Sequence, residues 1–140
     1  MNRVIVVEPG GGEVISGGTS VRHVKVDIES LHLTEYSVQT APMGSLHTHE
    51  RHADAFYVLK GQLEVALSET ETVLLEPGGF AVAPPGAVHA FGVPERARFL
   101  NIHAPGMSFA AYLREIVALG ESGERPSPEL FERFDMHIGE

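Results

Sequence analysis

Short apolar runs separated by glycine and proline constrain the fold of this chain more than any other feature of its sequence. From residue 1 to about residue 105 the runs are rich in Val, Leu and Phe, and turn residues interrupt them every eight to twelve positions. No helical periodicity lies between the runs. Many short strands without intervening helices indicate an all-β architecture, either a sandwich or a closed barrel.

The alternation of apolar and polar residues locates the individual strands. Leu31 and Leu33 continue the alternation of the preceding run, but Tyr36 and Val38 take the opposite parity, which predicts a bulge or a bend between the two pairs. The glycine-rich residues 10–18 do not precede a helix, so we expect a turn region there. We expect strands at residues 3–7, 24–28, 31–38, 55–59, 63–67, 73–75, 80–83, 87–93 and 99–103.

The spacing of the apolar residues changes near the C-terminus. Across Phe109–Val117 they recur at i, i+3, i+4, i+7 and i+8, which is one face of a helix, and Gly120 follows as the expected stop. Ser127 and Pro128 predict the N-cap and first turn of a second, shorter helix. We therefore expect one domain over residues 1–140, with a barrel at about 20–104 and a helical tail at about 107–138.

Charge and composition exclude several classes of function. The 19 acidic and 10 basic residues give a net charge of −9, which argues against nucleic acid or an anionic membrane surface as a partner. The absence of cysteine excludes disulfides and thiolate metal sites. No apolar run is long enough to span a membrane, and residues 1–12 lack the pattern of a secretion signal. We therefore expect a cytoplasmic protein without a membrane partner.

Histidine is unevenly distributed along the chain. His47 and His49 are two positions apart, so on an extended strand they project from the same face. Asp54 follows five residues after His49, and His89 belongs to a later strand. Imidazoles and a carboxylate suit a divalent ion such as iron, manganese, nickel, copper or zinc. These residues could therefore enclose one ion inside a barrel, or be ordinary polar residues on a solvent-facing strand.

Two segments resemble the two sequence motifs of the cupin superfamily. Residues 44–61 carry two histidines, an acidic residue after a gap of four, and a glycine after a further six, like the first motif. Residues 78–89 keep glycine, proline, glycine and histidine at the separations of the second. The resemblance extends over about Leu31–Ile116. It implies a double-stranded β-helix, or jelly-roll, barrel with short C-terminal helices.

The resemblance also implies a metal site. His47, His49 and His89 stand where cupins place three metal-binding imidazoles, and Asp54 stands where they place a carboxylate, so we expect one divalent transition metal per chain. The usual carboxylate is glutamate. Because aspartate is one methylene shorter, Asp54 reaches the ion directly, reaches it through a water, or leaves that position open, in which case His52 is a candidate substitute.

Strand parity suggests which side chains surround the site. If Asp54 faces the interior, Tyr57 and Leu59 face outward, and a homodimer would cover them. Three other histidines, His23, His32 and His137, have no cluster around them and are expected at the surface. The candidate pocket residues are Tyr36, His52, Phe56, Val58, Phe91 and His103.

The resemblance favours an enzyme that acts on a small organic molecule. The preferred hypothesis is a metal-dependent oxidoreductase of the dioxygenase type, in which Asp54 is a metal ligand or a general base. The alternatives are a cupin isomerase or cyclase, and a binding module that holds a metal or a small ligand without turnover. An open coordination position with a base within reach would favour the enzyme.

Overall fold

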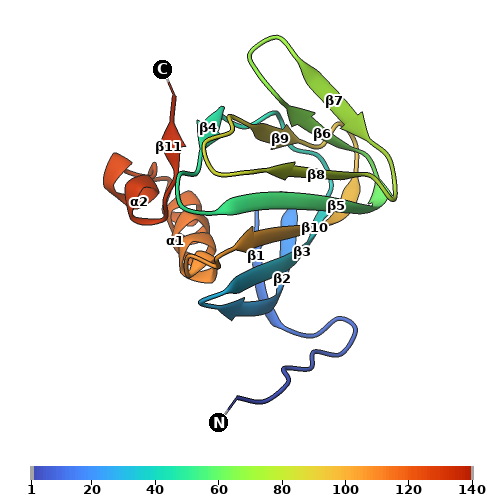
Figure 1. Ribbon diagram of the computed structural model, residues 1–140, viewed down its shortest axis with the longest axis vertical. Coiled ribbons are helices and arrows are strands. Elements are labelled where there is room, and N and C mark those ends of the chain that lie inside the picture. The colour runs from blue at the N-terminus through green and yellow to red at the C-terminus, as the bar shows by residue number, and fades with distance from the viewer. Residues whose placement is uncertain (1, 140) are drawn as a thin grey trace.

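Three antiparallel β-sheets and two C-terminal helices make up residues 2–139, the part of the chain that this computed structural model describes (Figure 1). The larger sheets have strand orders β1-β2-β3-β10-β5-β8 and β7-β6-β9, and β11 pairs with β4. In chain order the elements are β1 (Glu13–Gly17), β2 (Ser20–Ile28), β3 (Leu31–Val38), β4 (His47–Thr48), β5 (Ala53–Gly61), β6 (Leu63–Ala66), β7 (Thr72–Leu75), β8 (Phe80–Ala83), β9 (Ala90–Gly92), β10 (Ala97–Ala104), α1 (Phe109–Ser122), α2 (Pro128–Arg133) and β11 (His137–Ile138).

The six-stranded and three-stranded sheets enclose the main hydrophobic core. Phe56 and Val58 of β5 meet Leu63 and Val65 of β6 there, so the core joins the two sheets although hydrogen bonds do not close them into one barrel. Burial of these apolar side chains is the main force that holds the sheets face to face. The predicted all-β jelly-roll architecture is confirmed.

The inward face of the large sheet is apolar at one end and polar at the other. On β3 the buried side chains include His32, Thr34 and Tyr36, at every second position. The strand has no bulge, contrary to the parity prediction; the register irregularity lies in β2, between Val24 and Val26. The prediction failed because polar residues occupy the buried positions at the start of β3. His32 is likewise buried, not at the surface.

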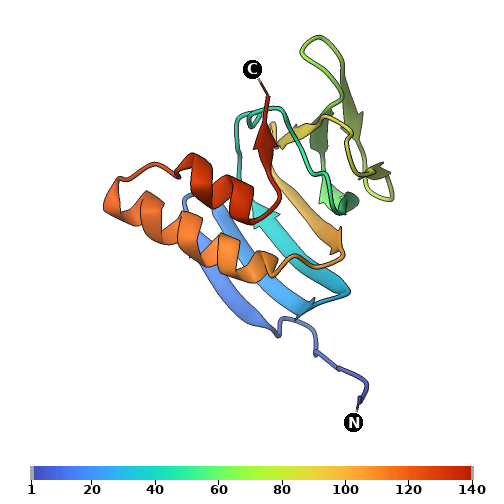
Figure 2. The same cartoon turned by 60° about the vertical axis from the view of Figure 1, so that its left-hand side comes forward.

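The two helices lie side by side, with α1 against β1 and β2 and α2 next to β11 (Figure 2). Phe109 and Leu113 of α1 form a second core with Ile15 of β1 and Val24 of β2. Helix α1 runs through Gly120, which was the expected stop, and ends at Ser122 before a left-handed glycine. No helix within residues 2–139 has the length and apolarity needed to cross a membrane.

The N-terminal part of the strand prediction is wrong. Residues 3–7 form no strand, and the N-terminal arm (residues 2–8) extends away from the sheets, with Val4 89% exposed (Figure 1). The first strand, β1, instead lies inside the glycine-rich stretch where a turn was expected. Only Ile15 of this strand is buried, so the sequence has almost no alternation to reveal it.

Candidate functional site

The polar end of the barrel gathers three histidines and one aspartate from separate segments. His47 lies on β4, His49 follows that strand, Asp54 lies on β5, and His89 directly precedes β9. Backbone hydrogen bonds of 3.0 Å in both directions join His47 to His89. One nitrogen or oxygen atom from each of the four side chains lies within 4.8 Å of the others. The structure thus brings together the four residues selected from the sequence.

Backbone carbonyls fix how each imidazole of this group presents its nitrogens. In all three rings Nδ1 lies within hydrogen-bond distance of a carbonyl oxygen, which can only accept. Each Nδ1 therefore carries a proton, and Nε2 is the nitrogen of each ring that is left to face the group. The acceptors are Ser45 for His47 at 2.9 Å, Asp135 for His49 at 2.8 Å, and Ala87 for His89 at 3.0 Å.

The carboxylate of Asp54 faces two of these Nε2 atoms. Its Oδ2 lies 2.9 Å from Nε2 of His89 and 3.3 Å from Nε2 of His49. Two lone pairs and a carboxylate oxygen repel one another unless a cation, either a proton or a metal ion, lies among them. This set of three imidazole nitrogens and one carboxylate oxygen fits a divalent transition metal.

Asn101, which sequence reasoning missed, orients this carboxylate. Its amide nitrogen donates to Oδ1 of Asp54 at 2.6 Å and to the carbonyl of Ala55 at 3.1 Å, which leaves Oδ2 directed at the histidines. Its amide oxygen in turn accepts from Nε2 of His103 at 3.0 Å. His103 stacks on Phe109 of α1, with ring centroids 3.9 Å apart. Asn101 and His103 therefore form a buried chain of hydrogen bonds that fixes the orientation of the Asp54 carboxylate.

Burial and neighbouring charges shift the pKa values of the group. Burial lowers the pKa of His47 to about 4, so this imidazole is neutral at pH 7. Burial opposes the ionised form of Asp54, but His103, His49 and His89 together hold the pKa of that carboxyl well below its usual range. Burial lowers the pKa of His103 to about 3. Burial opposes the charged form of His89, but the hydrogen bond and the charge of Asp54 raise the pKa of this imidazole, so a metal ion that bound here would displace the proton of His89.

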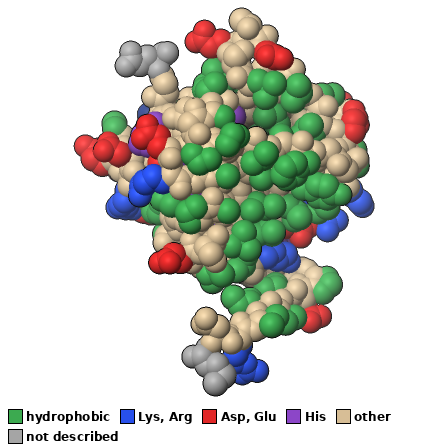
Figure 3. Space-filling view, viewed as in Figure 1, with side chains coloured by type: hydrophobic (Ala, Val, Ile, Leu, Met, Phe, Trp, Pro, Cys, Tyr) green, Lys and Arg blue, Asp and Glu red, His purple; other side chains and the backbone are tan. Residues whose placement is uncertain are grey.

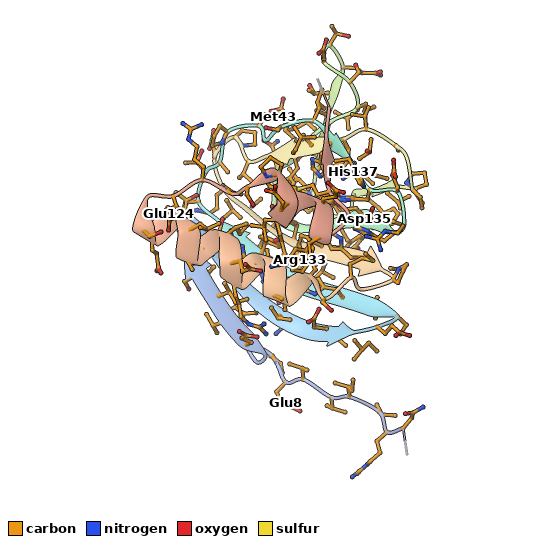
Figure 4. All side chains as sticks on the ribbon, turned by 90° about the vertical axis from the view of Figure 1, so that its left-hand side faces the viewer. Glu8, Met43, Glu124, Arg133, Asp135 and His137 are labelled. Atoms are coloured by element: carbon orange, nitrogen blue, oxygen red, sulfur yellow. The ribbon has the colours of Figure 1, made fainter. Side chains whose placement is uncertain are left out.

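The C-terminal tail supplies a second residue that sequence reasoning missed. Asp135 is fully buried where α2 leads into β11 (Figure 4), and its carboxylate accepts from the backbone of Glu50 at 3.1 Å and of Arg51 at 2.7 Å. The same carboxylate accepts from Nδ1 of His52 at 2.8 Å, while its carbonyl holds His49. The tail therefore fixes the loop that carries the histidines.

His52, the candidate substitute ligand, lies in the loop between β4 and β5. It is fully buried, and its Nε2 has no hydrogen-bond partner among the described residues. With His49 and His103 it forms a second group of imidazoles whose nitrogens lie within 4.8 Å of one another. His52 thus lies next to the four-residue group and shares His49 with it.

A cavity of about 380 Å³ opens beside the four-residue group. Its wall includes three of the candidate pocket residues, Tyr36, Phe91 and His103, but not Phe56, Val58 or His52. Phe56 and Val58 pack between the sheets instead, because the cavity extends toward the helices. The helices contribute Phe109, Tyr112, Leu113, Ile116 and Phe131. This size and largely apolar lining are typical of a small-molecule site.

The carboxylate of Asp135 provides a stability test of the tail. Burial opposes its charge, but the backbone amides of Arg51 and Glu50, with His52, lower the pKa of Asp135 from 3.8 to about 2. The ionised form therefore stabilises the fold above pH 3.8, and this contribution is lost as the pH falls toward 2. We expect Asp135→Asn to lower the free energy of unfolding by about 2 kcal/mol at pH 7, measured in urea with a chelator present.

The difference in the free energy of unfolding between Asp135→Asn and the unsubstituted chain should shrink as the pH falls from 3.8 toward 2. Glu50→Gln is the matched control, because it removes a neighbouring carboxylate whose side chain is 68% exposed, and it should change stability little. An equal effect of the two substitutions at pH 7, or a difference independent of pH, would contradict the role given to Asp135.

Comparisons with known proteins agree with this architecture. A family model described as "Cupin domain" matches residues 35–103. No curated protein matches the chain. Among solved structures, KdgF from Halomonas sp. is similar with 27% identity and a TM-score of 0.55, over 62% of this chain and 81% of that one.

Two further solved structures are similar in fold. An RmlC-like cupin from Shewanella frigidimarina has 22% identity and a TM-score of 0.59, over 67% of this chain and 84% of that one. The polyketide cyclase RemF from Streptomyces resistomycificus has 23% identity and a TM-score of 0.59, over 74% of this chain and 79% of that one. With both motifs on one jelly-roll scaffold and the family model spanning them, this chain belongs to the cupin superfamily.

Proposed function

We propose that this cupin is a metal-dependent enzyme that acts on a small organic molecule, and that its reaction is an oxidation of the dioxygenase type. The observation that carries the proposal is the convergence of imidazole Nε2 atoms and Oδ2 of Asp54 at the wall of the cavity. His47, His49, His89 and Asp54 would hold a divalent ion, and such an ion could accept a substrate and dioxygen as further ligands. A purely structural metal site would instead be closed.

Each side chain has a defined task in this proposal. His47, His49 and His89 hold the ion through Nε2, and Oδ2 of Asp54 is either the fourth ligand or the base that accepts a proton from the substrate. The bound ion supplies Lewis acidity and, for a redox-active metal, electron transfer. Asn101 keeps Oδ2 directed at the ion in both cases. The apolar walls keep water away from the reacting molecule.

Two other functions use the same site. An isomerase or cyclase would need Asp54 for proton transfer and no dioxygen, and the aromatic cavity wall, together with the fold likeness to a polyketide cyclase, favours this alternative. A binding module would hold a metal and a ligand without turnover. Dioxygen consumption separates the first proposal from both of these.

Metal content tests the site itself. We expect the untagged protein to contain about one equivalent of a divalent transition metal per chain, and His49→Ala to contain only a trace, because the variant loses a central ligand. Elemental analysis of the two purified proteins measures this. His23→Ala is the control, since His23 lies outside the cluster, and it should keep its metal. The same trace in all three preparations would refute the metal site.

Oxygen uptake tests the reaction. With pentane-2,4-dione, quercetin or a small aromatic carboxylate as substrate, we expect the metal-loaded protein to consume dioxygen in proportion to the product formed, as measured with an oxygen electrode. Asp54→Asn should lower kcat about 100-fold or more through loss of the base or the ligand. If the variant keeps its metal, Asp54 acts as a base. Turnover without dioxygen, or binding without turnover, would replace the dioxygenase by the cyclase or the binding module.

We also propose that the protein is a homodimer. On the outer face of β5 and β8, Tyr57 lies opposite Phe80, and Val82 lies beside them; Phe80 is 55% and Val82 51% exposed. Figure 3 shows apolar side chains gathered on this face and along the N-terminal arm. β8 also ends its sheet, so its second edge is unpaired within the described residues. A second copy would cover both the patch and the edge.

Sedimentation equilibrium checks the dimer. We expect a mass of twice the 15.1 kDa chain at micromolar concentration, and a shift toward the monomer for Phe80→Glu, because a buried charge would then oppose association. Ile28→Glu replaces an exposed apolar residue outside the patch and should leave the mass unchanged. A monomeric unsubstituted protein would rule out the dimer.

A further inference from the structure

One permanent cation, Arg22 of β2, lines the cavity at a distance from the histidine cluster. It is the only lysine or arginine among the described residues of the cavity wall. Its Nε and Nη1 are buried and have no hydrogen-bond partner within residues 2–139. A guanidinium stays protonated at every relevant pH, so Arg22 cannot avoid the cost of these unpaired donors by losing a proton. Buried charged donors without acceptors are costly, which points to a missing partner.

The fold holds this guanidinium in place. Arg22 pairs with Tyr36 of β3 in the sheet, and its guanidinium carbon lies 5.5 Å from the centre of the Tyr36 ring. That ring stacks on Phe99 of β10, with centroids 5.0 Å apart and planes within 4° of parallel. The aromatic surface supports the cation but offers no carboxylate. Arg22 is therefore positioned without being neutralised.

The one carboxylate of the cavity wall is already engaged elsewhere. Asp54 binds Asn101 through Oδ1 and faces two histidines through Oδ2. Across the sheet, Asp54 is paired with His103 of β10. Arg22 is instead aligned in one row, through Tyr36 of β3, with Phe99, which lies four positions earlier on β10. Four residues of strand separate the two rows by about 13 Å. Arg22 and the histidine cluster are therefore two separate polar groups in the wall of one cavity.

We propose that Arg22 binds the anionic group of the substrate, so that the cavity accepts small aromatic or apolar carboxylates in preference to neutral molecules. The substrate carboxylate satisfies the free guanidinium N–H groups. Its body lies against Phe91 and Phe109, and its far end reaches the histidine cluster. A monoanion matches the single positive charge, whereas a phosphate dianion would bury an uncompensated charge. The net charge of −9 repels anions from the protein as a whole, so an anion binds only next to a local positive charge such as that of Arg22. This inference names the substrate class of the proposed function and rests on it.

Binding of benzoate and of its neutral analogue benzamide tests the inference. By calorimetry, we expect the unsubstituted protein to bind benzoate about tenfold more tightly than benzamide, and Arg22→Gln to bind the two equally. Arg22→Lys, which keeps the charge but not the planar donors, should retain part of the preference. The control is Arg114→Gln, which removes a surface cation paired with Glu13 and should keep the full preference.

Thermal unfolding separates this role from a structural one. Because Arg22→Gln removes unsatisfied buried N–H groups, its Tm should equal or exceed that of the unsubstituted protein. A clear fall in Tm, an absence of benzoate binding, or equal binding of both probes by the unsubstituted protein would overturn the inference.

Two results distinguish this inference from the proposed function. Loss of benzoate binding in His49→Ala but not in Arg22→Gln would place the anion at the metal cluster, so the inference would fail and the proposed function would stand. If Arg22→Gln abolishes the benzoate preference although elemental analysis finds only trace metal, the metal-dependent function fails and the anion site stands.

Discussion

The polar end of this barrel depends on the approach of imidazole nitrogens to one buried carboxylate. Carbonyl oxygens of Ser45, Asp135 and Ala87 accept hydrogen bonds from Nδ1 of the three rings, which directs Nε2 of His49 and His89 at Asp54. A carboxylate and a nitrogen lone pair attract each other only when a cation lies between them. The raised pKa of His89 shows that a proton can serve as this cation. A metal ion bound among the same atoms would replace that proton, so metal and protons would compete for the group.

The parts of the site that lie close together in sequence are the parts that sequence reasoning could predict. His47 and His49 share one segment with Asp54, and strand parity relates their directions. Asn101 contacts Asp54 across 47 positions, and Asp135 contacts the histidine loop across more than 80. Those contacts depend on strand register and on the path of the tail, which the periodicity of the sequence does not encode.

The prediction of β3 failed for a different reason. Parity arguments assume that buried positions are apolar. Here His32 and Thr34 occupy buried positions because they hydrogen-bond to each other, at 2.6 Å, and His32 also hydrogen-bonds to Asp27. Polar residues that satisfy one another inside a barrel look like surface residues in the sequence. In β3 the mismatch between parity and burial lies at the polar end of the barrel, next to the candidate site, where buried residues are chosen for hydrogen bonding and not for apolarity.

The large sheet also fixes the distance between the two polar points of the cavity. Arg22, Tyr36 and Phe99 form one row across three strands, and His103 and Asp54 belong to another row of the same ladder. Strand rise and register set the spacing of these rows, whereas loops would let it vary. A ligand that bridges them is therefore selected by length as well as by charge. Helix α1 closes the cavity over both rows, with Phe109 stacked on His103, so the helical tail shapes the proposed substrate site directly.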